Sequence, residues 1–265
     1  MVPNDEPVED VIPAVRQLYQ SKIGSLMYLM LGTRPDLAYS IGKLASFSSN
    51  PSSHHIHALD RVLLYLHGSV SLHLDWWPEE ENLAPTGFTD ADFAGDSSDR
   101  KSIGAYCFNI TGTVFSWSSK KESTIATSTM EAEYIALYMG SQQATWIYQF
   151  YKQIGFPLDE PIEIFCDSQP ALSVAKGEET HRKAKHLDVD LHSVRERVTL
   201  GQIQLTLGTK GGVPGWYTGN TLQGHGQSTH HIPTWALEVH SEFSKLISLQ
   251  FPWSRKYLVH LQCPQ

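Results

Sequence analysis

The sequence predicts an α/β protein: a mixed five-stranded sheet flanked by helices, preceded by a small helical subdomain. Two observations support this fold class. Apolar residues first recur at helical spacing, and from Leu72 their spacing changes toward the alternation of strands. From there the predicted order is strand, strand, strand, helix, strand, helix, helix, strand, which is typical of a mixed sheet with helices on its faces.

The composition is that of an ordinary soluble protein. The 265 residues are 41% hydrophobic and 18% charged, enough to bury a core. The formal net charge of -8 argues against a basic coat for nucleic acid, so any such contact must use a local basic patch or metal ions. Three scattered cysteines without CxxC spacing favour a reducing compartment. With no leader and no long apolar run, we expect an intracellular protein, cytoplasmic or nuclear, without membrane contact.

Three amphipathic helices are predicted within residues 14–70, after a flexible lead-in over residues 1–13. Their expected apolar positions are Leu18, Ile23, Leu26, Met27 and Met30 in the first helix, Leu37, Ile41, Leu44 and Phe47 in the second, and Ile56, Leu59, Val62, Leu63 and Leu66 in the third. Adjacent histidines point in different directions on a helix, so His54, His55 and His57 fit an exposed helix start better than a metal site.

Strands are predicted over residues 85–90, 103–110 and 113–117 as an antiparallel meander. A long helix follows. Its expected apolar stripe consists of Ala132, Ile135, Ala136, Met139, Trp146, Ile147, Phe150 and Ile154. A fourth strand over 162–166, a short helix, a helix over 185–199 and an edge strand over 203–207 complete the predicted domain.

Three carboxylates, those of Asp90, Asp92 and Asp96, lie close together where the first predicted strand ends. A calcium loop would need a glutamate at its twelfth position, where Lys101 stands, so that interpretation fails. Asp167 follows the fourth predicted strand, and sites in α/β sheets form where the carboxyl ends of neighbouring strands open apart. With a third acid from the long helix, these residues would hold two Mg²⁺ ions, which suits phosphodiester hydrolysis.

The strings around these acids are similar to a known family. Residues 88–90 (FTD), 133–137 (EYIAL) and 164–169 (IFCDSQ) resemble the three acidic motifs of ribonuclease H. TDADFAGD at 89–96, DRKS at 99–102, FSWSSKK at 115–121 and KHLD at 185–188 resemble the ribonuclease H domain of copia-type LTR-retrotransposon polyproteins. GTRPDLAY at 32–39 and SNP at 49–51 resemble the end of the reverse transcriptase region there. The resemblance covers about residues 18–210.

The resemblance implies a ribonuclease H-like domain over residues 71–210, with residues 14–70 as a helical remnant of the reverse transcriptase connection. It implies that Asp90, Glu133 and Asp167 are the catalytic metal ligands, binding two Mg²⁺ ions, for which Mn²⁺ can substitute, and that the substrate is the RNA strand of an RNA–DNA hybrid. Glu131 and Glu133 flank the apolar stripe almost symmetrically. The match to Glu-x-x-Ala selects Glu133 and keeps Glu131 as the alternative.

Further roles are assigned more loosely. Asp188, Glu131 and Asp92 are candidates for supporting the site. The basic residues expected to contact the hybrid are Arg100, Lys101, Lys120, Lys121 and Lys185, although ordinary solvated positions explain them equally well. No two aspartates are adjacent, so a polymerase site is not expected.

After Lys210 the sequence departs from the family. Members bring a fourth acid to the metals there, whereas no Asp or Glu occurs between Gly201 and Ala236. Residues 211–265 are interpreted as a divergent tail that is disordered or holds one helix. Two functions follow: an endonuclease, within the rest of a polyprotein if the chain is a fragment, or a catalytically impaired remnant that keeps the fold and nucleic-acid binding. A third hypothesis is a helical interaction module over residues 14–68.

Overall fold

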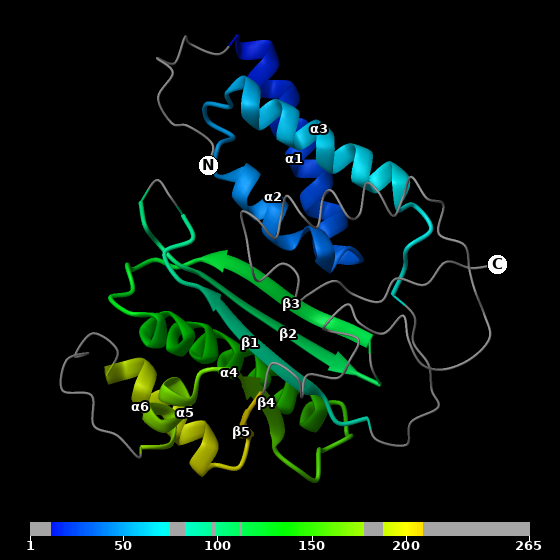
Figure 1. Ribbon diagram of the computed structural model, residues 1–265. Coiled ribbons are helices and arrows are strands. Elements are labelled where there is room, and N and C mark those ends of the chain that lie inside the picture. Colours follow the sequence, from blue (N-terminus) through cyan, green and yellow to red (C-terminus); the bar gives the residue numbers. More distant parts are fainter. Residues whose placement is uncertain (1–11, 75–82, 97–98, 112, 178–187, 209–265) are drawn as a thin grey trace, which may run out of the picture. The chain divides into compact units, whose positions relative to one another are not determined.

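A computed structural model of the chain describes residues 12–74, 83–96, 99–111, 113–177 and 188–208 (Figure 1). These residues belong to two compact units, with residues 12–74 in a helical unit and the described residues from 83 onward in an α/β unit. None of the helices in these ranges is both long and apolar enough to cross a membrane. The predicted lead-in and tail lie almost wholly outside the described ranges, and the predicted domain boundaries stay predictions.

The helical unit contains α1 (Pro13–Gly32), a 3-10 turn η1 (Pro35–Leu37), α2 (Ala38–Ala45) and α3 (Ser53–Gly68). Pro13 begins α1, where the missing N–H would have no partner in the helix. Tyr19 and Ile23 of α1 pack against Ile41 of α2 and Leu59 of α3 in one core. The Tyr19 hydroxyl donates to a backbone carbonyl of α2 at 2.9 Å. The three predicted helices are therefore present.

Two positions of the predicted stripe on α1 are wrong. Leu18 and Met27 are 57% and 38% exposed, whereas Tyr19, Ile23 and Leu26 are buried. The buried residues keep the spacing of four and three that one helix face requires. The core face is displaced because Tyr19, whose ring is apolar, fills the position that we had given to Leu18.

The α/β unit is built on a five-stranded sheet in the order β3-β2-β1-β4-β5. Strands β1 (Thr86–Asp92), β2 (Ile103–Ile110) and β3 (Thr113–Lys121) form an antiparallel meander. Strand β4 (Ile162–Cys166) runs parallel to β1, and β5 (Ile203–Leu207) runs parallel to β4. This arrangement places β1 and β4 side by side in the sheet, and it confirms the predicted mixed sheet.

Helices α4 (Thr129–Gln153), α5 (Gln169–Lys176) and α6 (Asp188–Thr199) flank this sheet (Figure 1). Helix α4 approaches β1 closely: a Cβ atom added at Gly140 would lie 2.4 Å from Cγ2 of Thr89. At Gly104 of β2 an added Cβ would lie 3.5 Å from Cβ of Ala136. Small residues at these contacts let α4 lie directly on the strands that carry the predicted acids.

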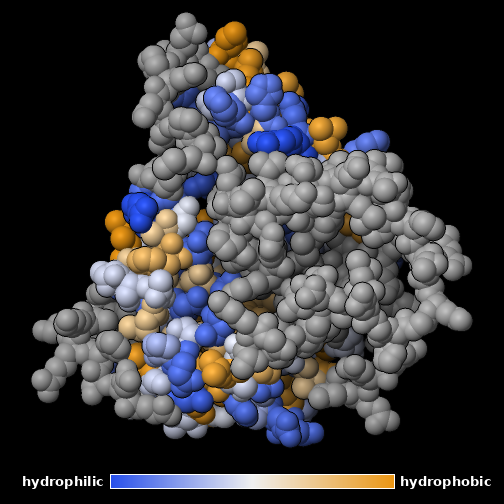
Figure 2. Space-filling view, in the orientation of Figure 1, coloured by the Kyte–Doolittle hydropathy of each residue, from blue (hydrophilic) through white to orange (hydrophobic). Residues whose placement is uncertain are grey.

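Three positions of the predicted α4 stripe are wrong. Trp146, Phe150 and Ile154 are 58%, 43% and 48% exposed, whereas the predicted Ile147 is buried, as are Ala136 and Ala144. Trp146 and Phe150 instead stack on each other, with ring centroids 5.4 Å apart. Figure 2 shows hydrophobic residues scattered among hydrophilic ones on the coloured part of the visible face, which is the ordinary pattern of a protein surface.

Three antiparallel strands, two further parallel strands and flanking helices form the mixed five-stranded sheet that the ribonuclease H resemblance implied. The predicted helices that precede the sheet are also present. The fold matters for function because Asp90 lies near the end of β1 and Asp167 directly follows the neighbouring strand β4.

Candidate metal centre

Asp90 and Asp167 come to the same edge of the sheet. In the parallel pairing of β1 with β4, Thr89 lies opposite Cys166. The residues that follow them, Asp90 and Asp167, are therefore also neighbours. Asp90 is 4% exposed and Asp167 is half-buried. The Thr89 hydroxyl donates to the Phe165 carbonyl at 3.4 Å and links the two strands at this point.

Glu133, in the second turn of α4, supplies a third carboxylate. One carboxylate oxygen from each of Asp90, Glu133 and Asp167 lies within 4.8 Å of the others. The start of the helix is fixed by Ser128, whose hydroxyl accepts the backbone N–H of Glu131 at 3.2 Å. The structure thus brings together the three acids that the sequence motifs singled out.

Glu131 has a different position from Glu133. It is 3% exposed, and its Oε2 accepts hydrogen bonds from the backbone N–H of Thr127 at 2.8 Å and from the Thr127 hydroxyl at 2.5 Å. These contacts satisfy donors at the beginning of α4. Glu131 is not part of the three-carboxylate cluster. Its carboxylate instead stabilises the start of α4.

The cluster suits a divalent metal. Three carboxylates at this separation repel one another when ionised, and a cation between them removes the repulsion. Oxygen atoms alone form the donor set, and hard divalent ions such as Mg²⁺ prefer such ligands. The residues present therefore fit a divalent metal ion.

Asp92 and Asp96 lie in the segment that follows Asp90, outside the cluster. An added Cβ at Gly95 would lie 2.0 Å from Oδ2 of Asp92, so only glycine fits beside that carboxylate. Asp96 is 2% exposed and forms an ion pair with Lys121, whose Nζ lies 2.8 Å from Oδ2. The Asp96 carbonyl also accepts the backbone N–H of Arg100 at 2.8 Å. Asp96 thus fixes the loop between β1 and β2.

The basic residues predicted to contact the hybrid differ in their contacts: some are bonded within the protein and others are exposed. Lys121 Nζ is bonded to Asp96 and also to Asp99, at 2.9 Å. Burial lowers the pKa of Lys121, but the two carboxylates outweigh it, so the pKa is raised. Lys101 Nζ donates to the Ser123 carbonyl at 2.7 Å. The remaining three residues are Arg100 and Lys120, which are exposed, and Lys185, which lies outside the described residues.

Among the side chains that the structure describes, α6 adds no carboxylate to the cluster. Asp188 begins α6, and its side chain lies outside the described residues. Asp190 is half-buried, and burial raises its pKa against the opposing effects of a hydrogen bond from Tyr138 and the charge of Arg197. Arg197 also donates to the Ser141 hydroxyl at 2.9 Å, so this group of contacts joins α6 to α4.

The sequence analysis missed Glu122. It follows Lys120 and Lys121 in the chain, and a charged run of this kind is usually solvated. In the structure it is 5% exposed, and burial together with the negative charge of Glu131 raises the pKa of Glu122 to about 8. The available signal was its position directly after a strand, where alternation can turn a charged residue inward.

Known proteins place this chain in a family, although no family model matches it. The retrovirus-related Pol polyprotein from transposon TNT 1-94 of Nicotiana tabacum is 39% identical over 180 residues, which are 68% of this chain and 13% of that protein. The Pol polyprotein from transposon RE1 of Arabidopsis thaliana is 33% identical over 187 residues, 71% of this chain and 13% of that protein. Over about 70% of its length, the chain is homologous to copia-type retrovirus-related Pol polyproteins. It spans about one eighth of the length of these relatives.

Shorter and more distant similarities accompany these Pol polyproteins. The secreted RxLR effector protein 161 of Plasmopara viticola is 43% identical over 129 residues, 49% of this chain and 90% of that protein. Among solved structures, LC11-RNase H1 in complex with an RNA/DNA hybrid is 15% identical with a TM-score of 0.35, over 48% of this chain and 86% of that one.

Proposed function

We propose that the α/β unit is a ribonuclease H-type endonuclease that hydrolyses the RNA strand of RNA–DNA hybrids with two Mg²⁺ ions, for which Mn²⁺ can substitute. The observation that carries this proposal is the convergence of Asp90, Glu133 and Asp167 within 4.8 Å at the edge of the central strands. These are the same acids that lie in the three ribonuclease H-like motifs.

The chain positions its carboxylates rigidly for this role. Asp90 belongs to a strand that pairs on both sides, with β2 and with β4. Asp167 precedes the N-cap of α5, where the Ser168 hydroxyl accepts the backbone N–H of Ala171 at 3.3 Å. Glu133 belongs to a helix whose first turn is capped by Ser128. Side chains held this way need little reorganisation when the ligand binds.

The three acids would hold the metal ions, and the ions, when bound, supply positive charge to the attacking and leaving oxygens of the phosphodiester. Exposed Arg100 and Lys120 would contact backbone phosphates, which position a nucleic acid without reading its sequence. Lys121 would act indirectly, because its ion pairs hold the loop from which Arg100 projects. A larger Pol polyprotein would be the physical context of this unit, as in the relatives.

A second candidate function is a catalytically impaired remnant that keeps the fold and binds nucleic acid. Within the described ranges the cluster contains three acids, and the sequence has no Asp or Glu between Gly201 and Ala236. Fewer carboxylates would weaken the binding of the second ion, which reduces turnover more than it reduces hybrid binding.

The deciding experiment is cleavage of a labelled RNA–DNA hybrid by the full chain at several Mg²⁺ concentrations, beside the variant Asp90→Asn. Asp159→Asn, at an exposed position of the same unit, is the matched control. Cleavage by the wild type and the control but not by Asp90→Asn supports the nuclease. Hybrid binding without cleavage by any of the three proteins supports the remnant. Equal cleavage by Asp90→Asn and wild type would contradict the assigned site.

A further inference from the structure

Glu122 is the first residue after β3, and its side chain is held inside the α/β unit. Its backbone N–H donates to the Ser102 carbonyl at 2.9 Å, which continues the pairing of β2 with β3 one position beyond Ile103 and Lys121. Ser102 is fully buried and Glu122 is 5% exposed. Because the backbone here is part of the ladder, the direction in which the side chain leaves the strand is fixed.

The carboxyl group of Glu122 is buried without a compensating contact. Among the described residues, neither Oε1 nor Oε2 has a hydrogen-bond partner. Lys121, the residue before Glu122, is bonded to Asp96 and Asp99, and Lys101, the residue before Ser102, to a backbone carbonyl. A buried ionised carboxylate with no donor is strongly unfavourable, so the neutral acid is the stable form in this position.

The charged group that acts on Glu122 is Glu131, in the first turn of α4. Glu131 is itself 3% exposed, but it accepts two hydrogen bonds from Thr127 and lies at the positive end of the helix dipole. Those contacts favour its ionised form. Of this buried pair, Glu122 is therefore the member that keeps a proton.

We propose that protonated Glu122 is a pH-sensitive latch on the first turn of α4. Loss of its proton introduces a second buried negative charge near Glu131, and this repulsion loosens the chain between β3 and α4. Glu133 lies two residues further along the same helix, so the latch also governs how firmly that carboxylate is held. The latch itself requires neither substrate nor metal, and it stands or falls independently of the proposed nuclease activity.

The sign of the pH dependence follows from linkage. Burial and the charge of Glu131 raise the pKa of Glu122 from 4.5 in a model peptide to about 8 in the folded chain. The folded protein therefore binds the proton at pH values where the unfolded chain has lost it. The stabilising contribution is fully present below pH 4.5, declines as the pH rises, and is lost above about pH 8.

Calorimetric unfolding of the full chain from pH 4.5 to 9, without divalent metal, tests the latch with Glu122→Gln, a neutral side chain of the same shape. We expect the melting temperature of Glu122→Gln relative to wild type to increase with pH, by roughly 5 °C over this range. The control Glu160→Gln removes an exposed carboxyl group of the same unit and should give a constant difference. A constant difference for Glu122→Gln as well would overturn the latch.

Hydrogen exchange gives the local measurement. After correction for the intrinsic effect of pH, the amides of Thr127, Glu131 and Glu133 should lose protection between pH 7 and 9 in wild type and keep it in Glu122→Gln. A carboxyl resonance of Glu122 that titrates with a pKa near 4.5, the ordinary value for glutamate, would also overturn the proposal. Either result leaves the nuclease proposal unaffected, because no cleavage is measured.

Discussion

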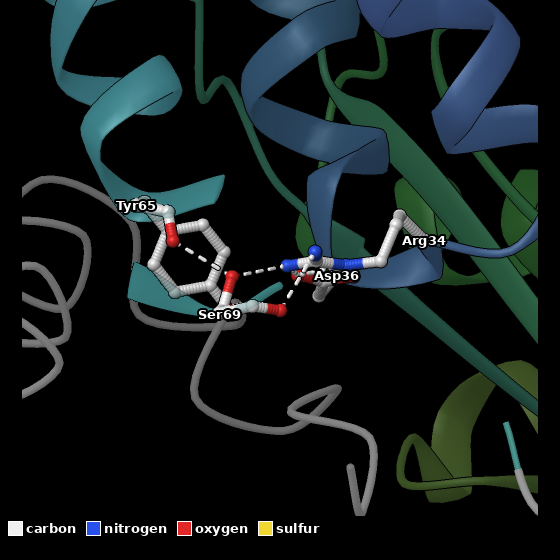
Figure 3. Close-up of polar contacts among 4 residues, drawn as sticks. All are labelled: Arg34, Asp36, Tyr65 and Ser69. Carbon is white, nitrogen blue, oxygen red and sulfur yellow. Dashed lines mark hydrogen bonds and ion pairs between the residues drawn. The ribbon is translucent and has the colours of Figure 1, made fainter. Parts of the chain in front are cut away.

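The two units of the chain bury charged groups in opposite ways. In the helical unit, Arg34 and Asp36 form an ion pair with Nη2 and Oδ2 2.7 Å apart, both side chains less than a tenth exposed (Figure 3). Arg34 also donates to the Ser69 hydroxyl at 2.8 Å and lies over the Tyr65 ring, 5.5 Å from its centroid. In the α/β unit, Asp90, Glu133 and Asp167 bring charges of one sign together.

The difference separates a structural charge from a functional one. Burial lowers the pKa of Arg34, but the hydrogen bond and charge of Asp36 outweigh it, so the pKa is raised and the pair stays ionised. This network joins the turn before α2 to the end of α3 and is complete in itself. The negative charges of the acidic cluster are neutralised by a bound cation, and a group of like charges of this kind is typical of a binding site.

The largest expected effect is that of a substitution in the three-carboxylate cluster, which should lower activity but raise stability. Asp90→Asn should reduce hybrid cleavage by about 10²–10³-fold or more. In metal-free buffer the same variant should be more stable than wild type by roughly 1 kcal/mol, because one of three repelling charges is removed. Cleavage rates and chemical denaturation measure the two effects. A loss of stability in metal-free buffer would mean that Asp90 is mainly structural.

Removal of one charge from the Arg34–Asp36 ion pair should instead lower stability. Arg34→Met leaves Asp36 buried without its guanidinium and should destabilise the helical unit by about 3–5 kcal/mol. The double variant Arg34→Met with Asp36→Leu should recover most of this loss, because neither charge remains. Denaturant unfolding measures both, with Arg16→Met, at an exposed arginine, as the control. A double variant as unstable as the single one would contradict the ion-pair explanation.

Neighbouring lysines on β3 give a smaller contrast within the α/β unit. Lys121→Met removes the ion pair with buried Asp96 and should cost about 1–2 kcal/mol of stability, discounted because Lys121 is partly exposed. Lys120→Met should leave stability unchanged and raise the KM for the hybrid through the loss of one phosphate contact. Thermal unfolding and steady-state cleavage distinguish them. The reverse pattern would make Lys121 the substrate contact.

The smallest effect is a pH response of the helical unit, opposite in direction to that of Glu122. His55 Nδ1 accepts the backbone N–H of Ser52 at 3.0 Å, so the neutral ring caps α3. Burial, followed by the charges of His54 and Lys43, lowers the pKa of His55 from 6.5. Protons then bind the unfolded chain more readily, and stability falls as the pH drops below about 6.5.

Replacement of His55 by Gln should remove this acid sensitivity, which we expect to be below about 1 kcal/mol. His57→Gln, at an exposed position of α3, serves as the control. Denaturation from pH 5 to 8 provides the measurement. An acid-induced loss that persists in His55→Gln would assign it to another group.

Local patterns in the sequence predicted most of the elements. The strands at 162–166 and 203–207 occur over the predicted ranges, because short apolar runs bounded by turn residues have few alternatives. The motifs around Asp90, Glu133 and Asp167 singled out acids that the structure brings within 4.8 Å. The face of a helix was predicted less well, since burial of Tyr19 and exposure of Trp146 depend on the surface that each helix meets.

The sequence by itself determined the order of the elements, the family and the acids at the strand ends, because these depend on local spacing and motif. The motif match favoured Glu133 over Glu131, and the tertiary structure decided between them by placing Glu133 beside Asp90. Periodicity gave Glu131 and Glu133 equal standing, and the position of α4 on β1 turned Glu133 to the cluster and Glu131 to the helix start. The burial of Glu122 was likewise decided in three dimensions, because the pairing of β3 with β2 fixes the direction of its side chain.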